Sequence, residues 1–369
     1  MSKVCIVSPL AYPLLMNEAS IKSAGGAEAQ LTVIGQGLFE RDFNVSFIVD
    51  DFGQDVICKK NNLTLYKVPF RYMGGNNLYL IQSWLLLFKQ LILIKPDVIL
   101  IKLPRHLLFP IGLYRKIFNK RLVFIGQIDH DINLNEIKKI EGRLNCFLYK
   151  CGIKMVDYVV AQNIKQRDGF RNQFGLNSEI IKSIVTLPED RNIKKEKYIL
   201  WVGNSLSKKQ PGLFVELAKL LPEYKFVMIM SSAEGGLHDE IKSQSTSVNN
   251  LEYLGFVPFS EISQYFKKAH LFVSTSLREG FPNTFLQSWQ YGTPVISLNI
   301  DPDNVIFDHK LGFISHDIQQ MMLDIKVMFS DTNKYIEYSN NTKAYVEKYH
   351  EKNAIINAFE NVFNQILPE

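Results

Sequence analysis

The chain has 369 residues, which exceeds one ordinary domain and predicts two, each large enough to bury its own core. Apolar residues make up 46% of the sequence and charged residues 21%, with a formal net charge of +5, as in a soluble globular protein. This mild charge, without a basic tail or a known nucleic-acid motif, gives no reason to expect nucleic-acid binding. The four cysteines are scattered and form no Cys-x-x-Cys pair, so we expect a reducing compartment and no structural metal.

No secretory signal is evident, because the apolar run at residues 4–7 is short and Pro9 follows it closely. The most membrane-like run, residues 79–94, contains Lys89 and two glutamines. It also falls short of the roughly 20 apolar residues that a spanning helix needs. We therefore predict a buried helix at residues 79–94 and a cytoplasmic protein.

Short apolar runs alternate with helical patterns through the first half of the chain. The predicted strands are residues 3–8, 45–49, 63–68, 97–103, 122–126 and 158–161. Such alternation predicts a doubly wound parallel sheet, in which ligands bind at the carboxyl ends of the strands. Residues 9–24, with two prolines and a mixture of polar residues, are predicted to be a mobile loop.

Two glycines, Gly25 and Gly26, precede a predicted helix with apolar residues at Leu31, Ile34 and Leu38. A glycine pair at a helix start lets a ligand approach the backbone, and the first N–H groups of a helix favour a phosphate. A simple turn is the alternative.

The polar loop after residues 122–126 contains His130 between Asp129 and Asp131. A histidine flanked by two carboxylates after a buried strand is a candidate functional residue, because the carboxylates could tune its charge state, although a lone histidine is often structural. Either aspartate could instead be only a helix cap.

Residues 89–121 are basic and apolar, with Asp97 as the only acidic residue. The cations are Lys89, Lys95, Lys102, Arg105, Arg115, Lys116, Lys120 and Arg121, joined by His106. One interpretation is a core helix with a solvated basic face. The other is an interfacial surface that docks on anionic lipid headgroups.

A charged segment with a proline, residues 187–197, is the predicted domain boundary. We assign residues 1–190 to the first domain, 191–345 to the second and 346–369 to a final helix within an amphipathic run at 335–367. The predicted strands of the second domain are residues 198–202, 225–230, 251–254, 271–276 and 295–299.

The stretch from 279 to 296 follows the last-but-one of these strands. Glu279, Gly280 and Pro282 form a turn, and a helical run then continues until Gly292, with Pro294 beyond it. A strand, a tight turn and a helix start in succession form an end that binds anions or hydroxyls, because the first N–H groups lack partners.

The motifs at residues 274–276 (Ser-Thr-Ser), 279–282 (Glu-Gly-Phe-Pro) and 291–296 (Tyr-Gly-Thr-Pro-Val-Ile) resemble the C-terminal signature of retaining GT-B glycosyltransferases. This is the large family of glycosyl transferases group 1, the family 4 type, which includes sucrose and trehalose-phosphate-type synthases. The resemblance implies an α/β GT-B fold: two Rossmann-like, doubly wound parallel-sheet domains with an interdomain cleft. In the family the final helix crosses back onto the first domain.

The resemblance also implies roles for individual residues. The catalytic set is His130 and Glu279, which would face the sugar, and Lys209, which would hold the diphosphate. The donor-binding set is Gly25, Gly26, Gly203, Asn204, Phe256, Phe281, Pro282, Asn283, Thr284 and Gln287. Phe256 would either stack on the base or merely pack.

Two positions depart from the family pattern. Asn204 stands where the family has an arginine, so one cation of the leaving-group site is missing. Gln287 stands where the family has a second glutamate, seven residues after Glu279, and would meet the ribose hydroxyls. No acidic DxD-type motif is suitably placed, so we expect neither a metal nor another cofactor.

The resemblance implies transfer of a sugar from a UDP- or GDP-linked donor to a glycan or lipid-linked acceptor, in bacterial surface polysaccharide or lipopolysaccharide synthesis. Such an enzyme would be cytoplasmic or peripheral on the inner membrane face, near anionic lipid. Two alternatives remain: a GT-B nucleotide-sugar epimerase, and a non-catalytic partner of a transferase that binds nucleotide sugars.

Overall fold

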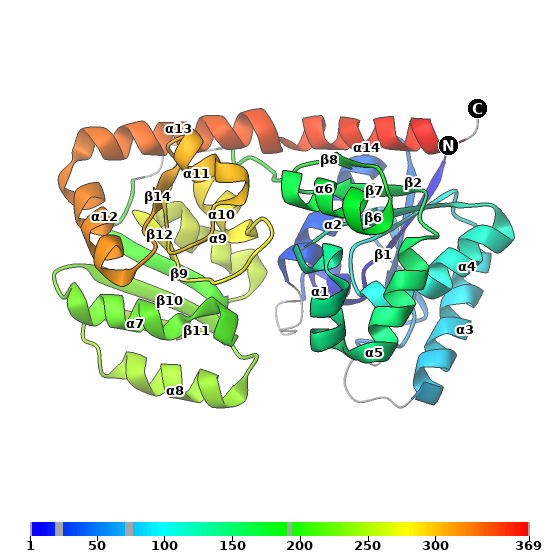
Figure 1. The fold of residues 1–369 in the computed structure, drawn as a ribbon, viewed down its shortest axis with the longest axis horizontal. Helices are drawn as coiled ribbons and strands as arrows, with labels where there is room; N and C mark the ends of the chain where they lie inside the picture. Colours follow the sequence, from blue (N-terminus) through cyan, green and yellow to red (C-terminus); the bar gives the residue numbers. More distant parts are fainter. Residues whose placement is uncertain (1, 19–24, 71–76, 128, 190–193, 368–369) are drawn as a thin grey trace. The chain divides into compact units, whose positions relative to one another are not determined.

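The structure is a computed structural model that describes residues 2–18, 25–70, 77–127, 129–189 and 194–367 (Figure 1). The chain divides into two compact units. The amino-terminal unit consists of residues 1–184 together with 352–369, and the carboxy-terminal unit of residues 185–351. The predicted boundary at 187–197 lies beside the first division, although residues 190–193 are outside the described part of the chain.

Eight strands form one sheet in the described residues of the amino-terminal unit, in the order β3-β4-β2-β1-β5-β6-β7-β8. Neighbouring strands are parallel except β3 and β4, which are antiparallel. The strands are β1 (Lys3–Val7), β2 (Asn44–Val49), β3 (Ile57–Lys60), β4 (Leu63–Lys67), β5 (Val98–Ile101), β6 (Arg121–Ile125), β7 (Tyr158–Ala161) and β8 (Ser178–Ile180). All six predicted strands are present, with ends shifted by no more than two residues.

Helices cover both faces of this sheet, which explains why its central strands are apolar throughout. One face packs against α2 (Gly26–Phe39) and α14 (Lys352–Ile366), which lie side by side. The other face packs against α3 (Asn77–Ile94), α4 (Leu108–Phe118), α5 (Leu134–Ile153) and α6 (Ile164–Phe174) (Figure 1).

Two predictions for this unit were wrong. Residues 9–16 are not a mobile loop: Pro9–Ala11 form a 3-10 turn and α1 (Tyr12–Met16) a short helix, whose Tyr12 and Leu15 enter the core. Residues 19–24 lie outside the described residues. The helix predicted at 79–94 is present as α3, but only one side is buried. Leu87 and Leu91 are fully buried, whereas Leu85 is 67% and Leu93 59% exposed. Among the described helices, none has the length and apolar character needed to cross a membrane.

Six parallel strands form the sheet in the described part of the carboxy-terminal unit, in the order β11-β10-β9-β12-β13-β14. They are β9 (Tyr198–Asn204), β10 (Lys225–Ser231), β11 (Leu251–Gly255), β12 (Leu271–Ser274), β13 (Val295–Ser297) and β14 (Gly312–Ile314). One face packs against α7 (Pro211–Leu220), α8 (Gly235–Thr246) and α12 (Ile318–Ser330). The other packs against α9 (Phe259–Lys268), α10 (Asn283–Trp289), α11 (Val305–Asp308) and α13 (Thr332–His350).

The helical run predicted at 335–367 is two helices. α13 ends at His350, Glu351 has extended backbone angles (φ −62°, ψ 138°), and α14 begins at Lys352. The break coincides with the second division of the chain, so α13 packs in the carboxy-terminal unit and α14 in the amino-terminal unit.

Both sheets have a topological switch point, where the strand order reverses direction. It lies between β1 and β5 in the amino-terminal unit and between β9 and β12 in the carboxy-terminal unit. Ligands of open parallel sheets bind at the carboxyl ends of the strands at such points. The loops that follow β1, β5, β9 and β12 are therefore the places to look for a site.

Candidate functional site

In the carboxy-terminal unit, the loops after β9 and β12 are bonded to each other. The Leu277 N–H donates to the Lys208 carbonyl at 2.8 Å, and the Thr275 hydroxyl donates to the Lys209 carbonyl at 2.7 Å. The same hydroxyl accepts from the Trp201 indole Nε1 at 3.0 Å. These bonds fix the 3-10 turn Ser207–Lys209 against the end of β12 and hold its lysines in place.

Two of the three predicted catalytic residues lie in direct contact here. Nζ of Lys209 forms an ion pair with Oε1 of Glu279, and the side chains are 19% and 14% exposed. Both groups are thus mostly shielded from water, with a small part of each side chain still exposed. A cation and a carboxylate side by side can hold a diphosphate and a sugar hydroxyl respectively.

Gly203 and Asn204 end β9. A Cβ at Gly203 would lie 2.7 Å from the Trp201 ring, so packing within the unit already requires glycine there. The side-chain oxygen of Asn204 is buried and has no hydrogen-bond partner among the described residues. An amide whose oxygen accepts no hydrogen bond from the described part of the chain therefore stands where the family pattern has an arginine.

The predicted donor-binding residues around α10 divide into two groups. The Phe281 side chain is buried and packs on the rings of His350, at 5.1 Å, and Trp289, at 6.2 Å, and Pro282 is buried as well. Asn283, Thr284 and Gln287 are half-buried, so their side chains remain accessible to a ligand.

Phe256 is half-buried in the loop after β11, directly after Gly255, whose φ of +66° is left-handed and favours glycine. β11 is an edge strand, separated from β12 by β10 and β9. Whether Phe256 stacks on a base or packs remains a prediction.

In the amino-terminal unit, the Gly25 N–H is already engaged. It donates to the Glu28 carboxylate at 3.0 Å, in the arrangement of a capping box. Gly26 is the first residue of α2. Glu28, three residues after the N-cap Gly25, was the signal in the sequence for this contact. The prediction that the first N–H groups of this helix are free for a ligand overlooked this signal, and it is wrong for the Gly25 N–H.

His130 lies in the 3-10 turn Asp129–Ile132, and the side chains of His130 and Asp129 are outside the described part of the structure. Asp131 is fully buried and is not a helix cap. Its carboxylate accepts from the Gln127 N–H and from Arg105 Nε, both at 2.5 Å.

The basic region predicted at 89–121 is not uniformly exposed, and two of its cations are buried. Lys102 is 3% exposed and Arg105 is 6% exposed. Burial lowers the pKa of Lys102 to about 8, against the charges of Glu28 and Asp131, which raise it. Burial also raises the pKa of the Glu28 carboxyl and lowers the pKa of His106 to about 4. Because they are buried, Lys102 and Arg105 do not belong to a surface for lipid headgroups.

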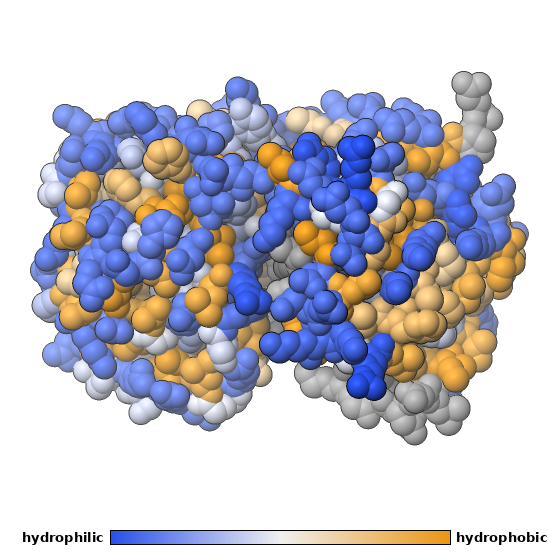
Figure 2. All heavy atoms as spheres, viewed as in Figure 1, coloured by the Kyte–Doolittle hydropathy of each residue, from blue (hydrophilic) through white to orange (hydrophobic). Residues whose placement is uncertain are grey.

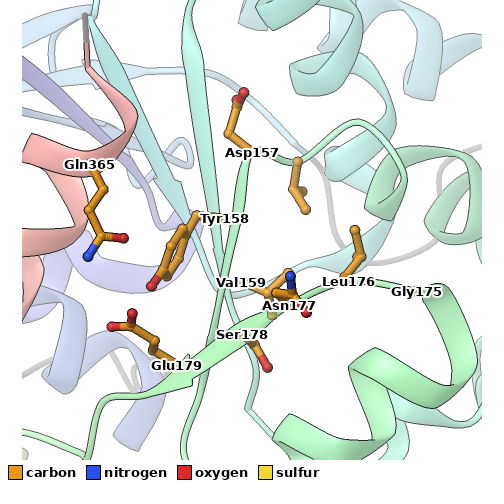
Figure 3. Close-up of a pocket in the computed structure, with 10 residues that line it drawn as sticks. Asp157, Tyr158, Val159, Gly175, Leu176, Asn177, Ser178, Glu179 and Gln365 are labelled. Atoms are coloured by element: carbon orange, nitrogen blue, oxygen red, sulfur yellow. The ribbon is translucent and has the colours of Figure 1, made fainter.

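A cavity of about 420 Å³ lies elsewhere in this unit, beside β7 and β8 (Figure 3). Asp157, Tyr158, Ser178, Glu179 and Gln365 contribute side chains to it. Asp157 and Ser178 stand at the amino ends of β7 and β8. The cavity therefore lies at the amino ends of the strands, whereas the loops after β5 and β6 lie at the carboxyl ends. In the described residues, no group of three or more His, Cys, Asp and Glu side chains is placed to hold a metal ion.

Residues 185–345 match the family model described as glycosyl transferases group 1. An uncharacterized glycosyltransferase of Haemophilus influenzae is 22% identical over 52% of this chain and 57% of its own length. The alpha-monoglucosyldiacylglycerol synthase of Streptococcus pneumoniae is 28% identical over 38% of this chain and 34% of its own length. The chain therefore spans between about a third and three fifths of these two relatives.

Similarity to solved structures extends over nearly the whole chain. Sucrose-phosphate synthase from Thermosynechococcus elongatus has a TM-score of 0.79 at 13% identity, with 99% of each chain covered. The Anabaena protein HepE in complex with UDP-glucose has a TM-score of 0.73 at 13% identity, with 99% and 100% covered. The predicted fold class, GT-B with two Rossmann-like parallel-sheet domains, is confirmed.

Proposed function

We propose that this chain, whose residues 185–345 match the family model of glycosyl transferases group 1, is a retaining glycosyltransferase that uses a UDP- or GDP-linked sugar. Its acceptor would be a lipid-linked glycan of bacterial surface polysaccharide synthesis, reached at the cytoplasmic face of the membrane. The observation that carries the proposal is the Lys209–Glu279 ion pair beside the switch point of the second sheet.

The chemistry explains why both charges are useful. When the anomeric C–O bond breaks, its electron pair stays on the diphosphate and the sugar becomes oxocarbenium-like. Lys209 would stabilise the growing negative charge, a type of interaction whose removal typically lowers turnover by about 10²–10³-fold. Glu279 would hold the sugar and favour its positive charge. His130 would also face the sugar, and no metal or other cofactor is required in this scheme.

The exposure of each side chain around α10 indicates how it would contact the donor. Asn283, Thr284 and Gln287 would offer side chains to the sugar and ribose, while Phe281 and Pro282 would contribute only through their backbone, because their side chains are buried. Asn204 supplies no charge, so Lys209 would carry the leaving-group interaction without a neighbouring arginine.

The lipid-linked acceptor is supported by an apolar surface on three neighbouring helices, α3, α4 and α5. Its exposed members are Ile81, Leu85, Leu86, Ile92, Leu93, Leu113, Ile117, Phe118, Ile140, Leu144 and Phe147. Figure 2 shows apolar side chains gathered over α3 and α4. Exposed cations interleave with them at Lys116, Lys138, Lys139, Arg143 and Lys150. Apolar insertion combined with cationic attraction is how peripheral proteins bind anionic leaflets.

The central test is turnover with a panel of UDP- and GDP-sugars, in the presence of lipid-linked and free glycan acceptors. We expect sugar transfer by the wild type and its loss in Glu279→Ala. Lys268→Met is the control, because it breaks an exposed ion pair with Glu196 in the same unit. Binding of UDP or GDP without turnover of any donor would contradict the proposal and indicate a non-catalytic protein. Conversion of the donor without any acceptor would indicate an epimerase.

The membrane surface has its own test, which is sedimentation with vesicles of phosphatidylglycerol. We expect the wild type to bind and the pair Leu85→Glu/Ile117→Glu to lose binding, because both side chains are 67% exposed on the proposed surface. The matched pair Leu323→Glu/Ile336→Glu changes exposed apolar residues of the carboxy-terminal unit and should leave binding intact. Equal binding by both double variants would reject this surface.

A further inference from the structure

A buried ionic network lies at the switch point of the amino-terminal sheet, in the loops after β5 and β6 and at the start of α2. It consists of Glu28, Lys102, Arg105, Asp131 and Glu141, which come from four separate segments of the chain. Lys102 is 3%, Arg105 6% and Asp131 0% exposed. Charges this deeply buried are costly unless each has a partner, so their grouping at one strand end calls for an explanation.

Arg105 joins two carboxylates. Its Nε donates to Oδ1 of Asp131 at 2.5 Å, and its Nη1 contacts Oε1 of Glu141 on α5. Burial lowers the pKa of Lys102, and the charges of Glu28 and Asp131 oppose this shift. Glu28 in turn accepts the Gly25 N–H at the start of α2. The contacts of Arg105 therefore join the loop after β5 to the turn after β6 and to α5.

Asp131 uses this network to hold the backbone around the turn Asp129–Ile132. Its second carboxylate oxygen accepts the Gln127 N–H at 2.5 Å, and its own carbonyl accepts the Tyr149 hydroxyl at 2.7 Å. The main chain is thus fixed at Gln127 and again at Asp131, on the two sides of His130.

We propose that Arg105 is a positioning residue for His130: through its contact with Asp131, Arg105 fixes the turn that carries His130. The proposal rests on the proposed function, in which His130 faces the sugar. It places Arg105 outside the set that touches the substrate.

The balance of charge argues against the competing interpretation, a second phosphate site. Two cations, Lys102 and Arg105, face three carboxylates, and both Nε and Nη1 of Arg105 already contact carboxylates. An added phosphate would increase an existing excess of negative charge. A network of this composition suits the fixing of a loop better than the binding of an anion.

The test uses Arg105→Lys, which keeps the positive charge but loses the planar fork that reaches two carboxylates. Arg115→Lys is the matched control. Arg115 also bridges to a partly buried aspartate, Asp157, with Nε donating at 2.8 Å, but at the amino end of β7. Both changes remove one guanidinium fork from the same unit.

The first measurement is hydrogen exchange of the full-length chain, followed by mass spectrometry. We expect Arg105→Lys to speed exchange in peptides covering residues 126–133 by about tenfold or more, and Arg115→Lys to leave these peptides unchanged. This arm does not depend on turnover. Unchanged exchange in Arg105→Lys would overturn the proposal, whether or not the chain proves to be a transferase.

The second measurement is a double-mutant cycle. We expect Arg105→Lys to lower kcat by about 10–100-fold with little change in the KM for the donor, because misplacement by about 1 Å can cost 10²-fold. In a His130→Ala background the same change should have almost no further effect on kcat, since the positioned group is gone. Additive losses would mean a general structural role and overturn the proposal. Absence of turnover in the wild type would instead refute the proposed function, and the exchange result would still decide the role of Arg105.

Discussion

The Lys209–Glu279 pair leads to a prediction in which two neighbouring substitutions have opposite effects. Nζ of Lys209 contacts Oε1 of Glu279, so the carboxylate partly neutralises the cation that we assign to the diphosphate. Lys209→Met should therefore weaken the binding of UDP or GDP. Glu279→Gln should strengthen it, because the ammonium then faces the phosphates without a competing carboxylate.

The magnitude follows from the exposure of the pair. Unit charges 4 Å apart interact by about 4 kcal/mol at an effective dielectric of 20, and exposed pairs contribute about 1 kcal/mol at most. The side chains are 19% and 14% exposed and thus still in contact with solvent, so we use the lower of these two figures. We therefore expect Glu279→Gln to lower the Kd for the nucleoside diphosphate by about 5-fold, corresponding to roughly 1 kcal/mol.

The assay is isothermal titration calorimetry with UDP and GDP, paired with turnover measurements. Lys209→Met should lower kcat by about 10²–10³-fold, and Glu279→Gln should lower kcat although it binds the nucleotide more tightly. Lys268→Met removes a lysine from a pair of 3.0 Å whose side chains are about half exposed, and it should change neither quantity. Weaker nucleotide binding by Glu279→Gln would refute the reasoning, because it would show that the carboxylate does not compete for Lys209.

Three further predictions concern neighbouring features. Gly203→Ala should lower stability by about 1–3 kcal/mol in thermal unfolding, because its Cβ would lie 2.7 Å from the Trp201 ring; Gly236→Ala, with nothing within 4 Å, is the control and should be tolerated. Asn204→Arg should raise nucleotide affinity and kcat by about tenfold each in the same calorimetric and turnover assays, and unchanged values would show that position 204 is out of reach of the phosphates. Burial lowers the pKa of His270 to about 4, so on acidification the unfolded state takes up this proton before the folded state does, and stability should fall as the pH drops from about 6.5 to about 4. His270→Phe should reduce this loss by at most about 3 kcal/mol, measured by urea unfolding at successive pH values. An unaltered pH dependence in the variant would contradict the assignment.

The central strands could be predicted from the sequence because strands of a covered parallel sheet are apolar on both faces. β1, β2, β5 and β6 all have this pattern. The strands that were missed lie at sheet edges and are short: β3 has two lysines in four residues, and β8 and β14 have three residues each. Their pairing is decided by the neighbouring strand rather than by their own composition.

The helix α1 was missed for a different reason. Its proline was treated as a sign of a loop, but Pro13 stands in the first turn, where a helix tolerates proline. The apolar face of α3 was misassigned as well, because periodicity shows that a helix has an apolar side but not whether the protein covers all of it.

The sites differ in how far the sequence could predict them. Lys209 and Glu279 were assigned to one site only through the resemblance to a family, since 69 residues separate them in the chain, and their ion pair was not predicted. The burial of Arg105 could not be foreseen, because its partners lie 26 and 36 positions away and no local pattern links them. A basic run looks the same in sequence whether its cations face solvent or carboxylates that the fold brings to them.

The two departures from the family pattern change the charge of the site in opposite directions. Asn204 in place of an arginine removes one positive charge, and Gln287 in place of a glutamate removes one negative charge, so the formal charge of the family's donor site is unchanged. Lys209 and Glu279, which match the family pattern, are in contact. A site that keeps its ion pair and exchanges two outer charges for two amides can still place a cation on the phosphates and a carboxylate at the sugar. Such a site should bind its donor with fewer charge-assisted hydrogen bonds, each of which is about twice as strong as a neutral one. The expected consequence is weaker donor binding and a slower chemical step that still proceeds.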